Sequence, residues 1–205
     1  MPDFSLEKEM QTSGHRLVAG IDEAGRGPLA GPVTAGAVIL PEGFCHEWVN
    51  DSKKLSESRR EKVYEDLIAD KGVIWGWGLA EAGEIDQINI LQATYLAMAR
   101  ALEALSVRPD AALVDGRPVQ GLPVPHRGVI KGDSLSMSIA AASIIAKVER
   151  DRLMRAYAIQ FPHYGFEQHK GYGTKKHLQG LNQYGPCAIH RKSFAPVAAA
   201  TGGVR

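Results

Sequence analysis

Two adjacent carboxylates, Asp22 and Glu23, end the apolar run 17–21, where the pattern predicts a buried strand. Burying an ionised carboxylate without a partner is strongly unfavourable, so these acids must be paired, protonated or bound to a metal ion. The chain continues Gly25-Arg26-Gly27-Pro28, in which the glycines let backbone groups approach a ligand and the arginine offers a planar donor fork for phosphate. The pattern predicts a metal-dependent site that acts on a phosphate-bearing substrate.

Composition sets the outer limits of the fold. The chain has 205 residues, of which 44% are hydrophobic, and this is enough for one domain with a full core. It has no uninterrupted apolar stretch of about 18 residues, and residues 1–14 are polar. We therefore expect a cytoplasmic protein with no signal peptide or membrane anchor, and a monomer. Cys45 and Cys187 lie far apart without CxxC spacing, which indicates reduced thiols.

Charge is unevenly distributed, although the formal net charge is only +1. Residues 1–146 carry 14 Lys and Arg against 20 Asp and Glu, whereas residues 147–205 carry 10 against 3 and four of the seven histidines. An acidic body joined to a basic C-terminal quarter fits a polyanion that one part holds and the other acts on. A basic segment that is merely solvated gives the same count, so charge alone leaves both interpretations open.

The order of apolar runs predicts an α/β fold with a central mixed sheet flanked by helices. The first strands are joined by short loops, which favours an antiparallel start, and later strands are expected to be linked by helices. The expected strands span 17–22, 32–40, 73–79, 111–114 and 127–131, and the expected helices span 57–69, 84–105 and 138–157. We divide the chain into a catalytic domain, 1–158, and a helical and loop extension, 159–205, that completes the substrate site.

Four acids, Asp22, Glu23, Asp115 and Asp133, lie at expected strand or helix ends, which converge on one crevice in an α/β sheet. Neighbours on a strand point to opposite faces, so Asp22 and Glu23 share a site only if the strand breaks there. Two carboxylates about 5 Å apart repel by roughly 3 kcal/mol at an effective dielectric of about 20. Such a cluster predicts a pair of Mg²⁺ or Mn²⁺ ions that act in phosphodiester cleavage. Helix capping is the alternative for Asp133.

Other chemistries fit the sequence poorly. The glycine-rich segment 20–27 has Arg26-Gly27 where a phosphate loop needs Lys and Ser or Thr, which argues against ATP binding. The chain has no HExxH and no Gly-x-Ser-x-Gly motif. Histidines 163, 169, 177 and 190 match no common zinc spacing, so phosphate or solvent contact is the preferred interpretation.

Several segments resemble, in the family's order, the motifs of type 2 ribonucleases H, the bacterial ribonuclease HII family. They are residues 20–28 (GIDEAGRGP), 51–55 (DSKKL), 114–116 (VDG), 131–133 (KGD), 140–147, 164–174 and 190–194 (HRKSF). The resemblance covers roughly residues 17–197. It implies a ribonuclease H-like fold with a small helical C-terminal extension.

The resemblance also implies an activity. A family member hydrolyses the RNA strand of RNA–DNA hybrids and cleaves 5′ of single ribonucleotides in duplex DNA, leaving 5′-phosphate and 3′-hydroxyl ends. By the same resemblance the four acids hold Mg²⁺ or Mn²⁺, the backbone of Gly25, Arg26 and Gly27 reads the ribose 2′-hydroxyl, and Tyr172 lies against the sugar. A 2′-hydroxyl is both donor and acceptor, which suits main-chain recognition.

Basic residues near these motifs are candidate phosphate contacts, namely Lys53, Lys54, Lys147, Lys170 and Arg191. A plain surface role is the alternative for each lysine, and simple packing is the alternative for Tyr172. Two other functions stay open at this point. One is a junction-resolving or integrase-like nuclease of the same fold, which would ignore the 2′-hydroxyl. The other is a non-catalytic module that binds hybrids and whose acids are structural.

Overall fold

The computed structural model, which describes residues 1–49, 52 and 55–201, is built on a five-stranded sheet of order β3-β2-β1-β4-β5. β1 pairs antiparallel with β2, and β2 with β3, whereas β4 is parallel to β1 and β5 is parallel to β4. The strands are β1 (Val18–Ala24), β2 (Val33–Ile39), β3 (Ile74–Ala80), β4 (Ala111–Asp115) and β5 (His126–Val129). The predicted mixed sheet with an antiparallel start is confirmed.

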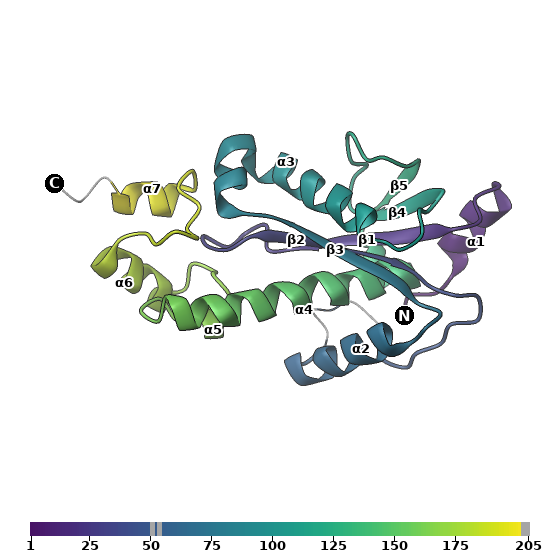
Figure 1. Cartoon of the computed structure of the whole chain (residues 1–205), viewed down its shortest axis with the longest axis horizontal. Helices are drawn as coiled ribbons and strands as arrows, with labels where there is room; N and C mark the ends of the chain where they lie inside the picture. The colour runs from purple at the N-terminus through teal and green to yellow at the C-terminus, as the bar shows by residue number, and fades with distance from the viewer. Residues whose placement is uncertain (50–51, 53–54, 202–205) are drawn as a thin grey trace.

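Helices cover both faces of this sheet (Figure 1). α3 (Ala82–Glu103) lies on one face, and α4 (Met137–Gln160) lies on the other with α2 (Glu57–Ala69) beside it. α1 (Ser5–Thr12) lies near the amino end of β1, and the short 3₁₀ helix η2 (Gly132–Ser134) precedes α4. Past the far end of α4 lie α5 (Phe166–His169), α6 (Lys175–Tyr184) and α7 (Ala195–Thr201). These short helices are the predicted C-terminal extension, and its boundary at residue 158 stays a prediction.

Glycines in the central strands let α4 pack directly on the sheet. A Cβ at Gly20 would lie 2.1 Å from the Ser138 carbonyl carbon, and one at Gly36 would lie 2.4 Å from the Ala142 oxygen. Any larger residue at either position would push the helix away. Because α4 is this close, its amino-terminal end and the 3₁₀ helix before it stay near the ends of β1 and β4.

Two details of the prediction were wrong. β4 and β5 are parallel, yet residues 116–125 join them as turns and loops without a helix. α1 was not predicted, because the segment is polar, with a buried Glu7 that accepts hydrogen bonds from the backbone N–H and hydroxyl of Ser138. In contrast, Ser56 caps α2 as predicted by accepting from the N–H of Arg59 at 3.3 Å.

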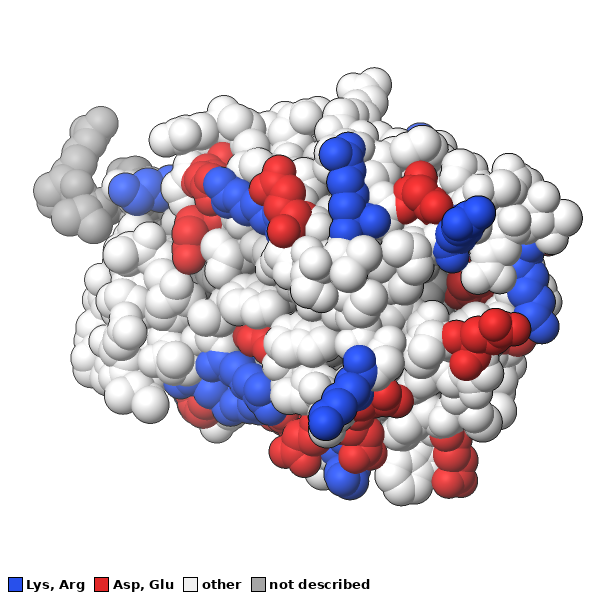
Figure 2. Space-filling view, turned by 45° about the vertical axis from the view of Figure 1, so that its right-hand side comes forward, with Lys and Arg blue, Asp and Glu red and all other residues white. Residues whose placement is uncertain are grey.

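The basic excess of the C-terminal quarter is partly balanced within the molecule. Arg152 and Arg155 on α4 pair with Glu61 and Glu57 on α2, with 2.7 Å between Arg152 Nη2 and Glu61 Oε2. Figure 2 shows acidic and basic side chains interspersed on the face it presents. Across residues 1–49, 52 and 55–201, no helix has the length and apolar character needed to span a membrane.

Candidate active site

The two parallel strands β1 and β4 carry predicted acids at their carboxyl ends, Asp22 two residues before the end of β1 and Asp115 as the last residue of β4. Their register pairs Ile21 with Val114, which makes Asp22 and Asp115 the next residues at the carboxyl ends of neighbouring strands. Ile21 and Val114 belong to the apolar core on the α3 side of the sheet. Strand alternation therefore directs Asp22 and Asp115 to the α4 side. Neighbouring parallel strands thus bring two distant carboxylates to one crevice.

Asp133 joins them from η2. The Gly132 N–H donates to Asp115 Oδ1 at 2.7 Å, which fixes η2 against the end of β4. One carboxylate oxygen from each of Asp22, Asp115 and Asp133 lies within 4.8 Å of the other two. The capping alternative for Asp133 is wrong, since Ser136 caps α4 by accepting from the Ile139 N–H at 3.1 Å.

The donor set of this cluster suits a hard divalent ion. All three groups offer carboxylate oxygens, and Asp22 and Asp133 are only 3% and 6% exposed. Gathering negative charge in a poorly solvated place is unfavourable unless a cation compensates it. Oxygen-only ligands select Mg²⁺ or Mn²⁺ over zinc, so the residues present fit the predicted ions.

Glu23 lies differently from its predicted partners. The strand does not break after Asp22 as the shared-site argument required, because β1 continues to Ala24 and Glu23 pairs with Ala35 of β2. Among the described acids, Glu23 is not within the 4.8 Å cluster. Its Oε1 lies 3.3 Å from Arg26 Nη1, and its side chain is 17% exposed. Glu23 therefore sits at the same strand end with its carboxylate turned toward Arg26.

The glycine-rich loop after β1 is held from inside by two buried arginines. Arg191 donates to the carbonyls of Gly25, Arg26 and Gly31 at 2.5, 2.8 and 3.0 Å. Arg150 donates to the carbonyls of Ala30, Pro32 and Lys170 at 3.2, 3.0 and 2.9 Å. Burial lowers the pKa of Arg150 to about 10 and that of Arg191 to about 9. Both guanidinium groups therefore remain charged at neutral pH and fix the course of the loop.

This arrangement places Arg191 away from its predicted role as a phosphate contact. Its side chain is fully buried, and its donors are directed to backbone carbonyls. Lys170 is also buried, at 8% exposure, and donates to the Glu167 carbonyl at 2.6 Å. Lys147 donates to Asp151 at 2.6 Å, and desolvation lowers its pKa. Lys53 and Lys54 lie outside the described residues.

Tyr172 meets the glycine-rich loop as the predicted sugar contact requires. A Cβ built on Gly27 would lie 3.6 Å from Tyr172 Cε1, and the tyrosine is 48% exposed. The neighbouring Gly171 accepts from the Leu29 N–H at 2.8 Å, which ties the two loops together. Arg26 extends into solvent beside them, with 49% of its side chain exposed.

Some residues that shape this region were missed by sequence reasoning. Arg150 was not singled out, although a charged residue on the buried face of a predicted helix was an available signal. The interpretation of the histidines as phosphate or solvent contacts is wrong for His177 and His190, which are 0% and 1% exposed and hydrogen-bonded to each other. Both cysteines are free thiols, as predicted.

A cavity of about 550 Å³ lies elsewhere, between α1 and the amino end of β1. Phe4, Leu17 and Ile39 are among the residues that line it. Asp22 is at the opposite end of β1, so this cavity is not part of the acid site.

A mixed sheet with helices on both faces and three aspartates gathered at its strand ends defines a metal-dependent nuclease of the ribonuclease H-like class. The chain matches the family described as Ribonuclease HII over residues 19–197. It belongs to the ribonuclease HII family, and is thus a ribonuclease H, a hydrolase of RNA in RNA–DNA hybrids.

Relatives and solved structures agree with this assignment. The chain is 54% identical to Ribonuclease HII of Syntrophus aciditrophicus, covering 92% of this chain and 89% of the relative. It is 53% identical to Ribonuclease HII of Chlamydia caviae, covering 94% of this chain and 90% of the relative. The crystal structure of ribonuclease H2 from Pyrococcus horikoshii superposes with a TM-score of 0.76 at 27% identity, covering 91% of this chain and 98% of that one. The structure of RNase HII in its complex with PCNA from Archaeoglobus fulgidus superposes with a TM-score of 0.71 at 26% sequence identity, covering 87% of this chain and 95% of that one.

Proposed function

We propose that this enzyme hydrolyses the RNA strand of hybrids and also cuts 5′ of single ribonucleotides in duplex DNA, leaving 5′-phosphate and 3′-hydroxyl ends. The observation that carries the proposal is the closeness in sequence and space of two features at the end of β1. One is the cluster of Asp22, Asp115 and Asp133, and the other is the loop that begins at Gly25. The first suits phosphodiester cleavage, and the second suits recognition of a sugar.

Asp22, Asp115 and Asp133 would hold Mg²⁺ or Mn²⁺, and Glu23, which lies at the same strand end with its carboxylate toward Arg26, stays a predicted fourth ligand. When bound, two such ions supply an activated water and stabilise the leaving oxygen. The chain itself orients the ligand oxygens. The Glu23 N–H donates to Asp22 Oδ1 at 2.7 Å, and the Gly132 N–H donates to Asp115 Oδ1 at 2.7 Å. Carboxylates held in this way need little rearrangement to bind an ion.

The loop of Gly25, Arg26 and Gly27 would read the ribose through its backbone. Arg191 binds the carbonyls of Gly25 and Arg26 from the protein side, which fixes the orientation of both peptide groups. Gly27 is exposed and has no Cβ to keep a sugar away. Tyr172, whose ring lies against Gly27, would then pack on the sugar at the junction with DNA. A 2′-hydroxyl at this point meets a backbone of fixed geometry, which a deoxyribose cannot satisfy.

Phosphate contacts then fall to fewer residues than the sequence indicated. Arg26 is exposed at the site and keeps its proposed role. Arg191 instead holds the glycine-rich loop from inside, and Lys170 donates to the Glu167 carbonyl in its own segment. Lys53 and Lys54 remain predicted contacts. Nucleic acid is the partner that this arrangement requires. The monomeric state and the cytoplasmic location stay expectations.

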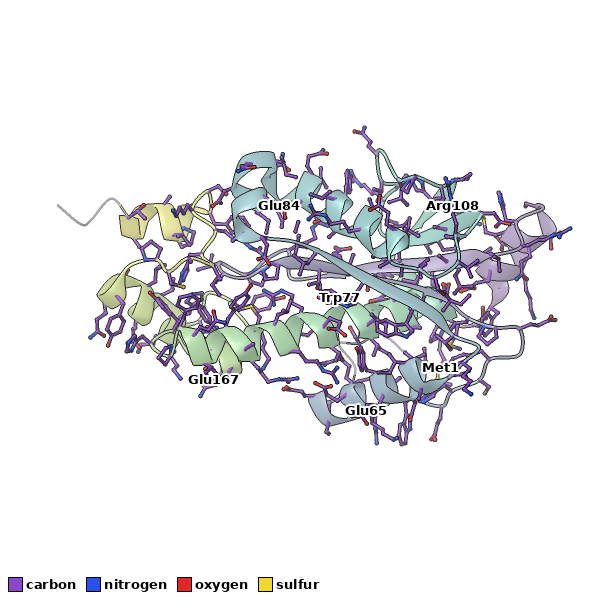
Figure 3. All side chains as sticks on the ribbon, in the orientation of Figure 1. Met1, Glu65, Trp77, Glu84, Arg108 and Glu167 are labelled. Atoms are coloured by element: carbon purple, nitrogen blue, oxygen red, sulfur yellow. The ribbon has the colours of Figure 1, made fainter. Side chains whose placement is uncertain are left out.

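The decisive experiment compares two substrates with Mg²⁺ and then with Mn²⁺. One is a DNA duplex that carries a single ribonucleotide, and the other is an all-DNA four-way junction. We expect cleavage of the first on the 5′ side of the ribonucleotide and none of the second. Asp115→Asn should lose this cleavage. Glu65→Gln is a matched control, because Glu65 lies on the outer side of α2 (Figure 3). An intact ribonucleotide duplex beside a cleaved junction would contradict the proposal.

A further inference from the structure

Two buried histidines form a hydrogen-bonded relay behind Tyr172. Cys187 N–H donates to His190 Nδ1 at 2.9 Å, and the Nε2 atoms of His190 and His177 lie 3.0 Å apart. At the other end, His177 Nδ1 lies 2.9 Å from the Tyr172 carbonyl oxygen. The relay thus runs from the loop after α6, through α6, to the backbone of the residue that faces Gly27.

The two ends of the relay fix the position of every proton within it. A carbonyl oxygen only accepts, so His177 Nδ1 must carry a proton, and a backbone N–H only donates, so His190 Nδ1 must be bare. His190 Nε2 then donates to His177 Nε2, and both rings are neutral. A second proton on His177 would set two N–H groups against each other at 3.0 Å. The relay therefore tolerates no additional proton.

A third histidine holds the other side of Tyr172. His169 Nδ1 accepts from the Gly171 N–H at 3.2 Å, and its Nε2 lies 2.8 Å from the Tyr164 carbonyl oxygen. By the same reasoning His169 is neutral with its proton on Nε2. Its ring stacks on that of His177, with the centroids 4.8 Å apart and the planes at 12°. Imidazole rings thus hold the backbone on both sides of the Gly171–Tyr172 bond, His169 at the Gly171 N–H and His177 at the Tyr172 carbonyl.

The surroundings of the relay keep these rings uncharged. Phe166 and Tyr164, both buried, pack against His177 and His190 with ring centroids 4.9 to 6.4 Å apart. Burial lowers the pKa values of all three histidines, that of His190 to about 4, and raises those of the Cys187 thiol and the Tyr164 hydroxyl. Glu167 and Lys176, which pair with each other at 3.5 Å, act on His169.

We propose that His177 and His190 are positioning residues for ribonucleotide recognition, which set the Tyr172 ring against Gly27 through a neutral imidazole relay. Neither histidine touches the substrate. The inference rests on the proposed function in one respect, namely that Tyr172 and Gly27 meet the sugar. The relay itself is a claim about proton positions, which is tested without any substrate.

Nitrogen-15 NMR of the metal-free, histidine-labelled wild-type protein tests the proton positions. We expect His177 as the Nδ1–H tautomer and His190 as the Nε2–H tautomer, both neutral at about pH 6, with each ring assigned by through-bond correlation to its own backbone in the wild-type protein. An imidazolium at that pH, or the opposite tautomer of either ring, overturns the relay. This result stands even if a substituted protein fails to fold.

Kinetics on the single-ribonucleotide duplex test the consequence. His177→Asn keeps an N–H at the position of Nδ1 and should stay within a few-fold of wild type. His177→Leu removes that donor, and we expect kcat to fall about 10- to 100-fold with a smaller change in KM. The reason is that the Tyr172 ring is displaced from Gly27, while the contacts with the substrate phosphates remain. Glu65→Gln, on the outer side of α2 (Figure 3), should leave the kinetics unchanged.

A reference variant separates the two possible failures. If Tyr172→Ala cleaves like wild type, the sugar contact in the proposed function is wrong, whatever the relay does. If Tyr172→Ala is impaired while a folded His177→Leu matches wild type, or if His177→Asn is as impaired as His177→Leu, the positioning role is overturned.

Discussion

Replacing Asp115 with asparagine should stabilise the metal-free enzyme. Carboxylate oxygens of Asp22, Asp115 and Asp133 lie within 4.8 Å of one another, and two unit charges at that distance repel by about 3 kcal/mol at an effective dielectric of about 20. Asp115 contributes to two of the three pairs, and asparagine keeps an oxygen to accept from the Gly132 N–H. Solvent and mobile ions weaken the repulsion, so we expect the free energy of unfolding to rise by about 1–3 kcal/mol.

Urea unfolding followed by tryptophan fluorescence measures this change, first in EDTA and then in millimolar Mg²⁺ or Mn²⁺. The wild type should gain stability from the ion, because only the folded state gathers the three acids. Asp115→Asn should gain less, and its cleavage of an RNA–DNA hybrid should fall at least about 100-fold. A variant that is less stable than wild type in EDTA, with the same gain from the ion, would show that Asp115 is structural and refute the reasoning.

Three further predictions concern the relay and the loop. Burial lowers the pKa of His190 from 6.5 to about 4, so the unfolded chain binds more protons than the folded one between these pH values. The free energy of unfolding should therefore drop by about 2 kcal/mol from pH 7 to pH 5. The same drop in His190→Gln would contradict this. Gly25→Ala should lose about 2 kcal/mol or more in thermal unfolding, because φ is +92° and its Cβ would lie 1.9 Å from Arg150 Nε. Gly27→Ala should unfold within about 0.5 kcal/mol of wild type, since its Cβ meets Tyr172 at an ordinary 3.6 Å, yet discriminate less between ribose and deoxyribose; unchanged discrimination would count against the sugar-reading loop.

Much of the fold and the centre of the site could be predicted, because they follow from local patterns. Apolar runs that end on Asp22 and Asp115 indicate strand ends, and parallel neighbours bring such ends together. The cap at Ser56 and the helix after it depend only on nearby residues. Asp133 follows a glycine before a long helix, so its place near the sheet end was also predictable.

Other features depend on contacts that a linear pattern does not contain. Lys and Arg are almost always exposed, so nothing local indicated that Arg191 is fully buried against carbonyls some 160 residues away in sequence. The pairing of His177 with His190 likewise arises only when α6 folds against the loop that follows it. Glu23 differs from its expected position because β1 continues its pairing with β2 for two residues beyond Asp22.

Anomalous scattering from crystals of the wild-type enzyme soaked in Mn²⁺ tests most directly whether Asp22, Asp115 and Asp133 form one ion site. We predict that the strongest anomalous peak lies about 2 Å from carboxylate oxygens of these residues, at the shared end of β1 and β4. The same soak of Asp115→Asn should weaken that peak or remove it. A strongest peak elsewhere on the protein, with these three carboxylates bound to no ion, would contradict the account.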